Sequence, residues 1–186
     1  DGGILTGSSG GSWQGVTLQP APGEWWAEAF LAALLRRDFD RGGSDRRWFD
    51  LFRKTEPSSP TGYYAMSELS RVILHGNFDY EQAAAHRVRN YRFLLDEIRD
   101  FALFPFLDDG TVPLGFPVCM QNRDEVRNAL FEIQVYPPLH WPIHEFIPSQ
   151  FTDSLRLEAE IMTLPCDQRL EPGDLGPQDL LGGGVQ

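Results

Sequence analysis

The most regular pattern of apolar and polar residues in the chain runs from Tyr80 to Phe104. Six apolar residues of this stretch share one face when residues three and four apart are aligned: Ala84, Val88, Tyr91, Leu95, Ile98 and Ala102. Charged residues lie off this face at offsets that allow ion pairs along a helix: Arg87, Arg89, Arg92, Asp96 and Glu97. The pattern predicts one amphipathic helix over residues 80–104, with its apolar face buried.

Shorter stretches on both sides alternate between helical and extended patterns. Further helices are predicted over residues 24–38, 44–53, 66–74, 123–133 and 149–160. Strands are predicted over residues 113–120 and 161–164, with an extended, proline-broken segment over residues 135–143. This order favours the α/β class, and for the last third a small α+β layer whose helices pack on a mixed or antiparallel sheet.

Two of these helices carry further expectations. Ser44 and Asn122 are residue types that cap helix N-termini, so each is expected to begin the helix that follows it. In the helix over residues 123–133, the apolar positions expected to face the core are Val126, Leu130 and Ile133.

Glycine and proline mark the candidate boundaries. Residues 1–23 read as turns and one short strand at Ile4 and Leu5, because glycines interrupt the rest. Residues 55–63 contain two prolines and a glycine and read as a linker. The tail from Pro172 is rich in glycine and proline and is expected to be disordered. The chain is therefore divided into residues 1–60, 61–172 and 173–186.

Composition and charge narrow the class of function. Apolar residues make up 41% of the chain, which is enough for a sizeable core. The net charge is −11 without a basic stripe, so neither a nucleic acid nor an anionic membrane surface is an expected partner. No apolar run reaches the roughly 18 residues that span a bilayer. Two cysteines do not make a disulfide framework, so a reducing, cytoplasmic location is expected.

Chemistry visible in the residues themselves is sparse. His140 and His144 have the spacing of a helical Zn²⁺ pair, but Pro142 lies between them and two ligands do not make a site, so no metal is predicted. One of these histidines packed and one exposed, or a histidine at the mouth of an active site, both stay open. Cys119 is expected to be a buried, inert thiol. The neighbouring Asp167 is expected to raise the pKa of Cys166.

Lys54 is the one lysine of the chain and therefore the one candidate for a Schiff base. It follows Arg53 near a helix end and precedes Thr55 and Glu56, which is a solvated and charged setting. A Schiff-base lysine is normally desolvated, so Lys54 is not expected to be catalytic.

Three pairs of stretches carry a resemblance to a known family. They are residues 62–69 (GYYAMSEL) with 87–91, residues 114–118 with 123–126, and residues 136–141 with 164–169. Together they resemble the DegT/DnrJ type of sugar aminotransferase, a family of fold-type-I enzymes that depend on pyridoxal 5′-phosphate (PLP). The resemblance covers residues 60–172 and the opening Asp1-Gly2-Gly3.

The resemblance implies which domain each part of the chain would belong to. Residues 61–172 would be the C-terminal small domain, and residues 1–60 would be the trailing part of the large PLP domain with connecting helices. The PLP-binding lysine of the family precedes such a Gly-Gly turn, so it would lie upstream of Asp1, and this chain would contain no catalytic residue.

The family also implies site residues and partners. Tyr63 and Tyr64 would bind the cofactor of the neighbouring subunit at a homodimer interface, and His140 would lie near the substrate. The reaction would transfer an amino group from an amino-acid donor, such as glutamate, to a keto-sugar nucleotide.

Two other functions stay open. A non-catalytic family remnant is one, because the Asn of the family's GYNYRM segment has no match beside Tyr64. A protein-interaction or binding domain is the other, because Trp25, Trp26 and Trp48 form an aromatic-rich face.

Overall fold

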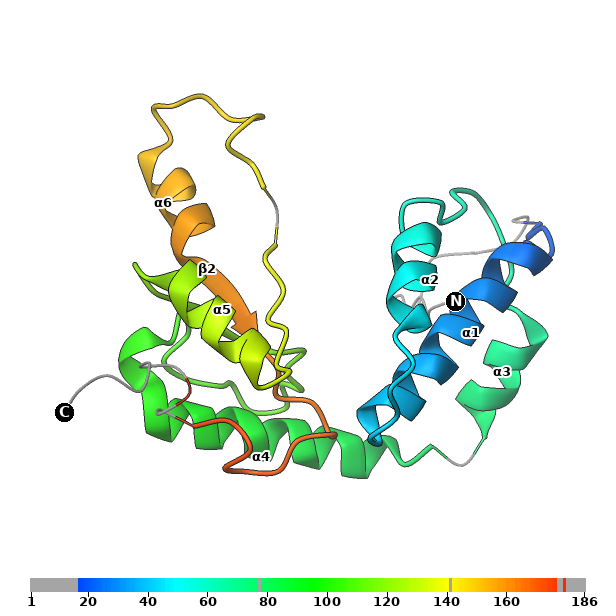
Figure 1. The fold of residues 1–186 in the computed structure, drawn as a ribbon, viewed down its shortest axis with the longest axis horizontal. Helices are drawn as coiled ribbons and strands as arrows, with labels where there is room; N and C mark the ends of the chain where they lie inside the picture. The colour runs from blue at the N-terminus through cyan, green and yellow to red at the C-terminus, as the bar shows by residue number, and fades with distance from the viewer. Residues whose placement is uncertain (1–16, 77, 141, 177–178, 180–186) are drawn as a thin grey trace, which may run out of the picture. The chain divides into compact units, whose positions relative to one another are not determined.

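The computed structural model describes residues 17–76, 78–140, 142–176 and 179, and it divides into two compact units. Unit 1 comprises Asp1–Phe78 and unit 2 comprises Asp79–Gln186. The strand predicted at Ile4 and Leu5 lies outside the described residues. The fold is a mixture of helices and a small antiparallel sheet, which confirms the α+β prediction at this level (Figure 1).

Unit 1 contains three described helices: α1 (Gly23–Asp40), α2 (Arg47–Thr55) and α3 (Glu68–His75). All three were predicted, with ends displaced by three residues or fewer. Ser67 caps α3, since its side chain accepts a hydrogen bond from the Ser70 N–H at 3.2 Å. The cap predicted at Ser44 is wrong, because the carboxylate of Asp45 accepts from the Arg47 N–H at 2.9 Å instead.

The end of unit 1 lies beyond the predicted linker. The N–H of Gln19 donates to the carbonyl of Tyr63 at 2.7 Å, and the N–H of Ala65 donates to the carbonyl of Gln19 at 2.7 Å. These bonds hold the segment after α2 to the residues before α1. The compact unit therefore continues through α3 to Phe78, whereas the sequence placed a boundary after residue 60.

Unit 1 buries few side chains. α1 and α2 lie against each other, and the indole N–H of Trp25 donates to the carbonyl of Thr55 at 2.9 Å. Among its described residues only three are fully buried: Ala32, Thr55 and Ser67. Large apolar side chains remain exposed on all three helices: Leu31, Leu34, Phe49, Phe52, Val72 and Ile73.

Unit 2 is organised around α4 (Tyr80–Ile98), whose N-terminus is capped by the carboxylate of Asp79. The helix ends six residues earlier than predicted, because a 3₁₀ turn, η1 (Arg99–Phe101), follows and Ala102 then forms an antiparallel bridge with Val118. Half of the predicted apolar face is buried, namely Tyr91, Leu95 and Ile98, whereas Ala84, Val88 and Ala102 are only half-buried.

The ion pairs predicted along α4 for Arg87, Arg89 and Arg92 are not found among the described residues. Arg87 donates to the carbonyls of Pro113 and Leu114, and Arg89 pairs with Glu171, a residue far away in sequence. These partners are supplied by tertiary packing, which helical offsets cannot show.

The described sheet has two antiparallel strands, β1 (Phe116–Cys119) and β2 (Ile161–Leu164), with Phe116 opposite Leu164. α5 (Arg123–Glu132) and α6 (Thr152–Glu160) lie between the strands in sequence. A single core joins α4, both strands and α5; its members are Tyr91, Leu94, Leu95, Ile98, Phe116, Val118, Met120, Val126, Leu130, Met162, Leu164, Cys166 and Leu175.

Three details of unit 2 differ from the sequence predictions. Ile133 is exposed, because α5 ends at Glu132 and Gln134 then takes a positive φ of 63°. Asn122 precedes α5 without a side-chain capping bond. Leu175 falls in the segment expected to be disordered, yet it is buried in the core. No described helix combines the length and apolar character needed to cross a membrane.

Candidate functional site

The carboxamide of Asn90 joins two parts of unit 2 that are distant in sequence. Asn90 lies on α4 and is buried; its Nδ2 donates to the carbonyl of Asp167 at 3.0 Å and to that of Leu170 at 2.8 Å. The carbonyl of Cys166 lies 3.5 Å from the same nitrogen. Residues 87–91 and 164–169, two of the stretches that carry the family resemblance, therefore meet here.

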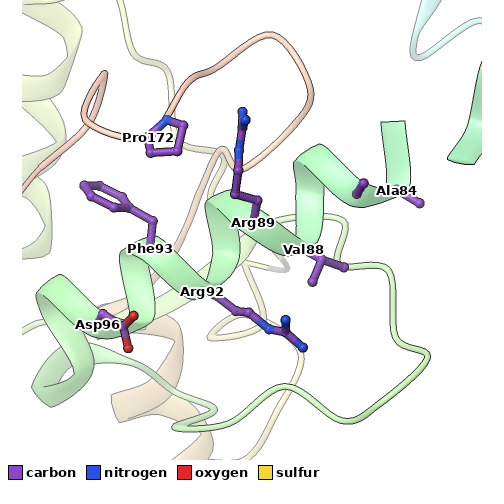
Figure 2. A pocket seen from close by; sticks show the side chains of 8 residues that line it. Ala84, Val88, Arg89, Arg92, Phe93, Asp96 and Pro172 are labelled. Atoms are coloured by element: carbon purple, nitrogen blue, oxygen red, sulfur yellow. The ribbon is translucent and has the colours of Figure 1, made fainter. Parts of the chain in front are cut away.

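A second contact holds the chain that follows this turn. The guanidinium of Arg89 pairs with the carboxylate of Glu171 at 2.6 Å, and both side chains are partly exposed. The N–H of Glu171 in turn donates to the carboxylate of Asp174 at 2.8 Å. These contacts hold Pro172 beside α4, and residues of α4 together with Pro172 line an open groove (Figure 2).

This α4 groove is open to solvent and has a volume of about 680 Å³. Its lining comes from successive turns of the exposed side of α4, with Pro172 added from the C-terminal segment: Ala84, Ala85, Val88, Arg89, Arg92, Phe93, Asp96 and Pro172. In Figure 2 the side chains of Val88 and Phe93 extend from the helix on different sides, with the two arginines between them in sequence.

The α4 groove is lined by apolar side chains, by the guanidinium groups of Arg89 and Arg92, and by the carboxylate of Asp96, which pairs with Arg99. Arg89 is engaged by Glu171, whereas Arg92 has no hydrogen-bond or ion-pair partner within the described part of the chain. Residues 79–186 carry eighteen acidic and eight basic side chains, so an unpaired guanidinium is unusual in this unit. The groove is suited to an apolar group that also presents a negative charge.

The residues predicted to bind cofactor and substrate lie in different units. Tyr63 is 75% exposed and Tyr64 is half-buried, and both belong to unit 1. His140 belongs to unit 2, is half-buried, and has its Nε2 at 3.1 Å from the Oγ1 of Thr163 on β2. Within each unit, the described structure brings neither tyrosine nor His140 together with a lysine.

His144 does not share a site with His140. The Nδ1 of His144 lies 2.6 Å from a carboxylate oxygen of Glu158 on α6, and this hydrogen bond raises the pKa of His144 above its ordinary value of 6.5. In the described chain there is no group of three or more His, Cys, Asp or Glu side chains that could hold a metal ion.

The described residues do not fit PLP on their own. The Nζ of Lys54 forms a 2.5 Å ion pair with Glu28, and both side chains are exposed, whereas a Schiff-base lysine is desolvated. Lys54 is therefore not in the environment of a Schiff-base lysine.

Cys119 is less buried than predicted, whereas the predicted effect of Asp167 on Cys166 is confirmed. Cys119 is half-buried, with its thiol 3.6 Å from the carboxylate of Glu160, and burial followed by this contact raises its pKa. Cys166 is the buried thiol, and burial is the main cause that raises its pKa to about 11, with Asp167 adding to the effect. Neither environment favours a thiolate nucleophile.

Asn90 and Glu158 were not singled out by the sequence. Asn90 could have been noticed as a polar residue beside Tyr91 on the inward side of a strong amphipathic helix. Glu158 carries no comparable signal, because carboxylates are common on short exposed helices. Comparison of the chain with family models, with curated proteins and with solved structures found no match.

Proposed function

We propose that this chain is the C-terminal part of a PLP-dependent aminotransferase of the DegT/DnrJ type. The observation that carries the proposal is the contact made by Asn90. Its carboxamide bonds to Asp167 and Leu170, so two of the stretches that resemble the family are adjacent in space as well as similar in sequence. A resemblance by chance would not require these two stretches to meet.

The shape of unit 2 gives further support. A long helix, an antiparallel pair of strands and short helices around one core agree with a small domain of the kind that the resemblance implies. In this proposal unit 2 closes over a site built mostly by the large domain, and His140 approaches the substrate, a keto-sugar nucleotide.

The sparse core of unit 1 also supports the proposal. Its helices leave Leu34, Phe52 and Val72 exposed, as expected for helices that pack against a larger domain. Tyr63 and Tyr64 would then lie at a homodimer interface. PLP and its lysine would be supplied by residues preceding Asp1 in a cytoplasmic protein, with glutamate as a candidate amino donor; when bound, PLP would act as the electron sink.

The test is the gene upstream of Asp1 and the protein that it encodes. The proposal expects an open frame of about 150–200 further residues, the size of a domain, with a lysine shortly before Asp1. The extended protein should retain PLP and fix it to that lysine on borohydride reduction, and glutamate should convert its bound cofactor to the amino form.

The 186-residue chain is the matched control. Mixed with PLP and reduced, it should show no stoichiometric label on Lys54, because this amine is exposed and paired with Glu28. A stop codon directly upstream of Asp1, or full labelling of Lys54, would overturn the proposal.

A second candidate function is a binding domain, and the α4 groove favours it. Ala84, Ala85 and Val88 are small, which lets another backbone approach the helix closely, and Arg92 offers an unpaired positive charge within the described structure. An amphipathic helix with acidic residues beside its apolar face fits both features.

A synthetic helical peptide with leucines four apart and glutamates beside them can test this. Titrated into the labelled chain, it should shift the amide signals of Ala85 and Val88 and lose affinity when Arg92→Glu reverses the charge. Arg37→Glu makes the same change of charge on α1 and should leave binding unchanged. Equal losses in the two variants would mean a general charge effect and no groove site.

A further inference from the structure

The connection between α5 and α6 is attached to the sheet near its beginning. The N–H of Thr163 on β2 donates to the carbonyl of Pro138 at 3.2 Å, and the side chain of Thr163 contacts His140. From there the connection extends away from α4 before it returns to α6 (Figure 1). Residues 142–148 of this return segment, here called the strap, have no strand or helix of their own.

One side chain of α6 holds the strap. The Glu158 side chain is only 14% exposed, and one of its oxygens accepts from the Nδ1 of His144 at 2.6 Å. The backbone amides of His144 and Ile143 also help to hold the pKa of Glu158 below its usual value, after the larger effect of the His144 ring. The other carboxylate oxygen is buried and has no hydrogen-bond partner in the described structure.

His144 is the positive group that faces this carboxylate. Arg123 of α5 reaches Glu158 only at its main-chain carbonyl and otherwise pairs with Asp124. Arg156 of α6 pairs with Glu160. On the strap itself, Glu145 lies 4.0 Å from the outer nitrogen of the His144 ring, which adds to the positive character of that ring.

We propose that the contact between the strap and α6 depends on pH. Protonated His144 holds the strap on α6, and the strap detaches more readily when the imidazole loses its proton. The reason is the incomplete solvation of Glu158. With a neutral imidazole beside it, the largely buried carboxylate loses its counter-charge, and its second oxygen is already without a partner in the described structure. Moving the strap away lets water reach both oxygens.

The two pKa shifts determine whether the contact between strap and α6 weakens or strengthens as pH rises. The pKa of His144 is raised by Glu158. The stabilisation that His144 gives to the contact between strap and α6 is therefore complete below the ordinary histidine pKa, and it disappears as pH rises through the raised pKa. The pKa of Glu158 is lowered. The stabilisation that its carboxylate gives to the same contact therefore disappears only in acid, as pH falls through the lowered pKa. The strap is therefore tightest in mildly acidic solution and loosens above neutrality.

Phe146 lies on the strap and is already 79% exposed, while the Pro138–Thr163 bond remains as a fixed end. The motion is thus confined to residues 142–148 and does not require the core of unit 2 to open. The inference is independent of the proposed aminotransferase role and of the α4 groove.

NMR of the full labelled chain tests it, with hydrogen exchange of the strap amides corrected for intrinsic rates at each pH. Between about pH 5.5 and pH 8, which brackets histidine titration, protection of the amides of residues 143–147 should fall by about twofold to fivefold, the range of an exposed ion pair. The midpoint should coincide with the titration of the His144 ring. Amides of Tyr91 and Leu95 in the core should not change.

Two variants distinguish the effect of the His144–Glu158 contact from a general loss of structure. Glu158→Gln keeps the shape of the side chain and removes its charge, so the His144 titration should move down and the pH dependence of the strap should vanish. Glu145→Gln, at the outer nitrogen, should keep the dependence. Strap amides with the same protection at all pH values, or an unshifted His144 titration in Glu158→Gln, would overturn the proposal.

Discussion

Among individual residues, Asn90 joins α4 to a distant segment, the turn at residues 166–170. The face of α4 that carries it is otherwise apolar. Its Nδ2 donates to carbonyls of a turn more than seventy residues later, while its buried Oδ1 has no hydrogen-bond partner in the described structure. The buried position of such an amide depends on those carbonyls. The sequence could predict the apolar face of α4 from its spacing alone, but it could not predict a polar member of the buried side whose partners come from another segment.

Replacing Asn90 by alanine should destabilise unit 2 by about 1–3 kcal/mol, because the partly buried carbonyl of Leu170 would lose its donor and that of Asp167 would keep only the N–H of Leu170. Urea unfolding followed by circular dichroism measures this change. Asn128→Ala removes the same side chain from an exposed position on α5 and serves as the control. A loss below about 0.5 kcal/mol for Asn90→Ala would mean that the amide bonds are replaced by water.

The two thiols should differ in reactivity. Burial raises the pKa of Cys166 to about 11, so its thiol stays protonated at pH 8, and its burial keeps reagents away in the folded state. Cys119 is half-buried and should react first with a thiol reagent. In Cys119→Ser the folded chain should therefore hardly react with the thiol reagent until denaturant is added. Rapid reaction of that variant in native buffer would show that the 165–170 turn opens.

At the scale of elements, helices were predicted better than their ends. α4 and β2 begin where the sequence placed them, since their patterns depend on local spacing. The end of α4 was misplaced because Ala102 leaves the helix to bridge Val118, a contact with a later segment. Ile133 was assigned to the core for the same reason: its helical spacing continues although α5 stops at Glu132.

The stability of α4 in unit 2 can be tested at Leu95, which is buried against the sheet. Leu95→Ala should cost about 2–5 kcal/mol in the free energy of unfolding if the site cannot collapse. Val72→Ala on α3 removes apolar atoms from a side chain that is 61% exposed, and should cost less than about 0.5 kcal/mol. Similar costs at the two positions would contradict the assignment of the core to unit 2.

At the scale of the whole molecule, charge and apolar surface are unevenly divided. Residues 17–78 carry eight acidic and eight basic side chains, whereas most of the negative charge lies in residues 79–186. Unit 1 has little net repulsion and a sparse described core, and unit 2 has a continuous core and a strong negative charge. The sequence located the apolar residues of unit 1, but helical spacing does not reveal whether each face meets a partner within the chain.

The exposed apolar residues of unit 1 lead to a prediction about association. Contiguous apolar surface beyond a few hundred Å² is uncommon on soluble monomers and promotes contact between molecules. Phe49 and Phe52 lie one turn apart on α2, and both are exposed. The chain should therefore bind a hydrophobic dye and self-associate through unit 1, and the net charge of −11 should slow large-scale aggregation without covering these side chains.

Sedimentation and dye fluorescence of full-length variants can locate the surface responsible. Phe49→Ser combined with Phe52→Ser should lower dye binding and shift the chain toward the monomer. Phe146→Ser, in unit 2, removes an equally large side chain that is 79% exposed but belongs to a strongly acidic unit, and should change both signals less. If the parent chain is a monomer that does not bind dye and melts in one cooperative step, the helices of unit 1 are already covered within the chain. Unit 1 would then belong to a complete fold, and the aminotransferase proposal would give way to a stand-alone binding protein.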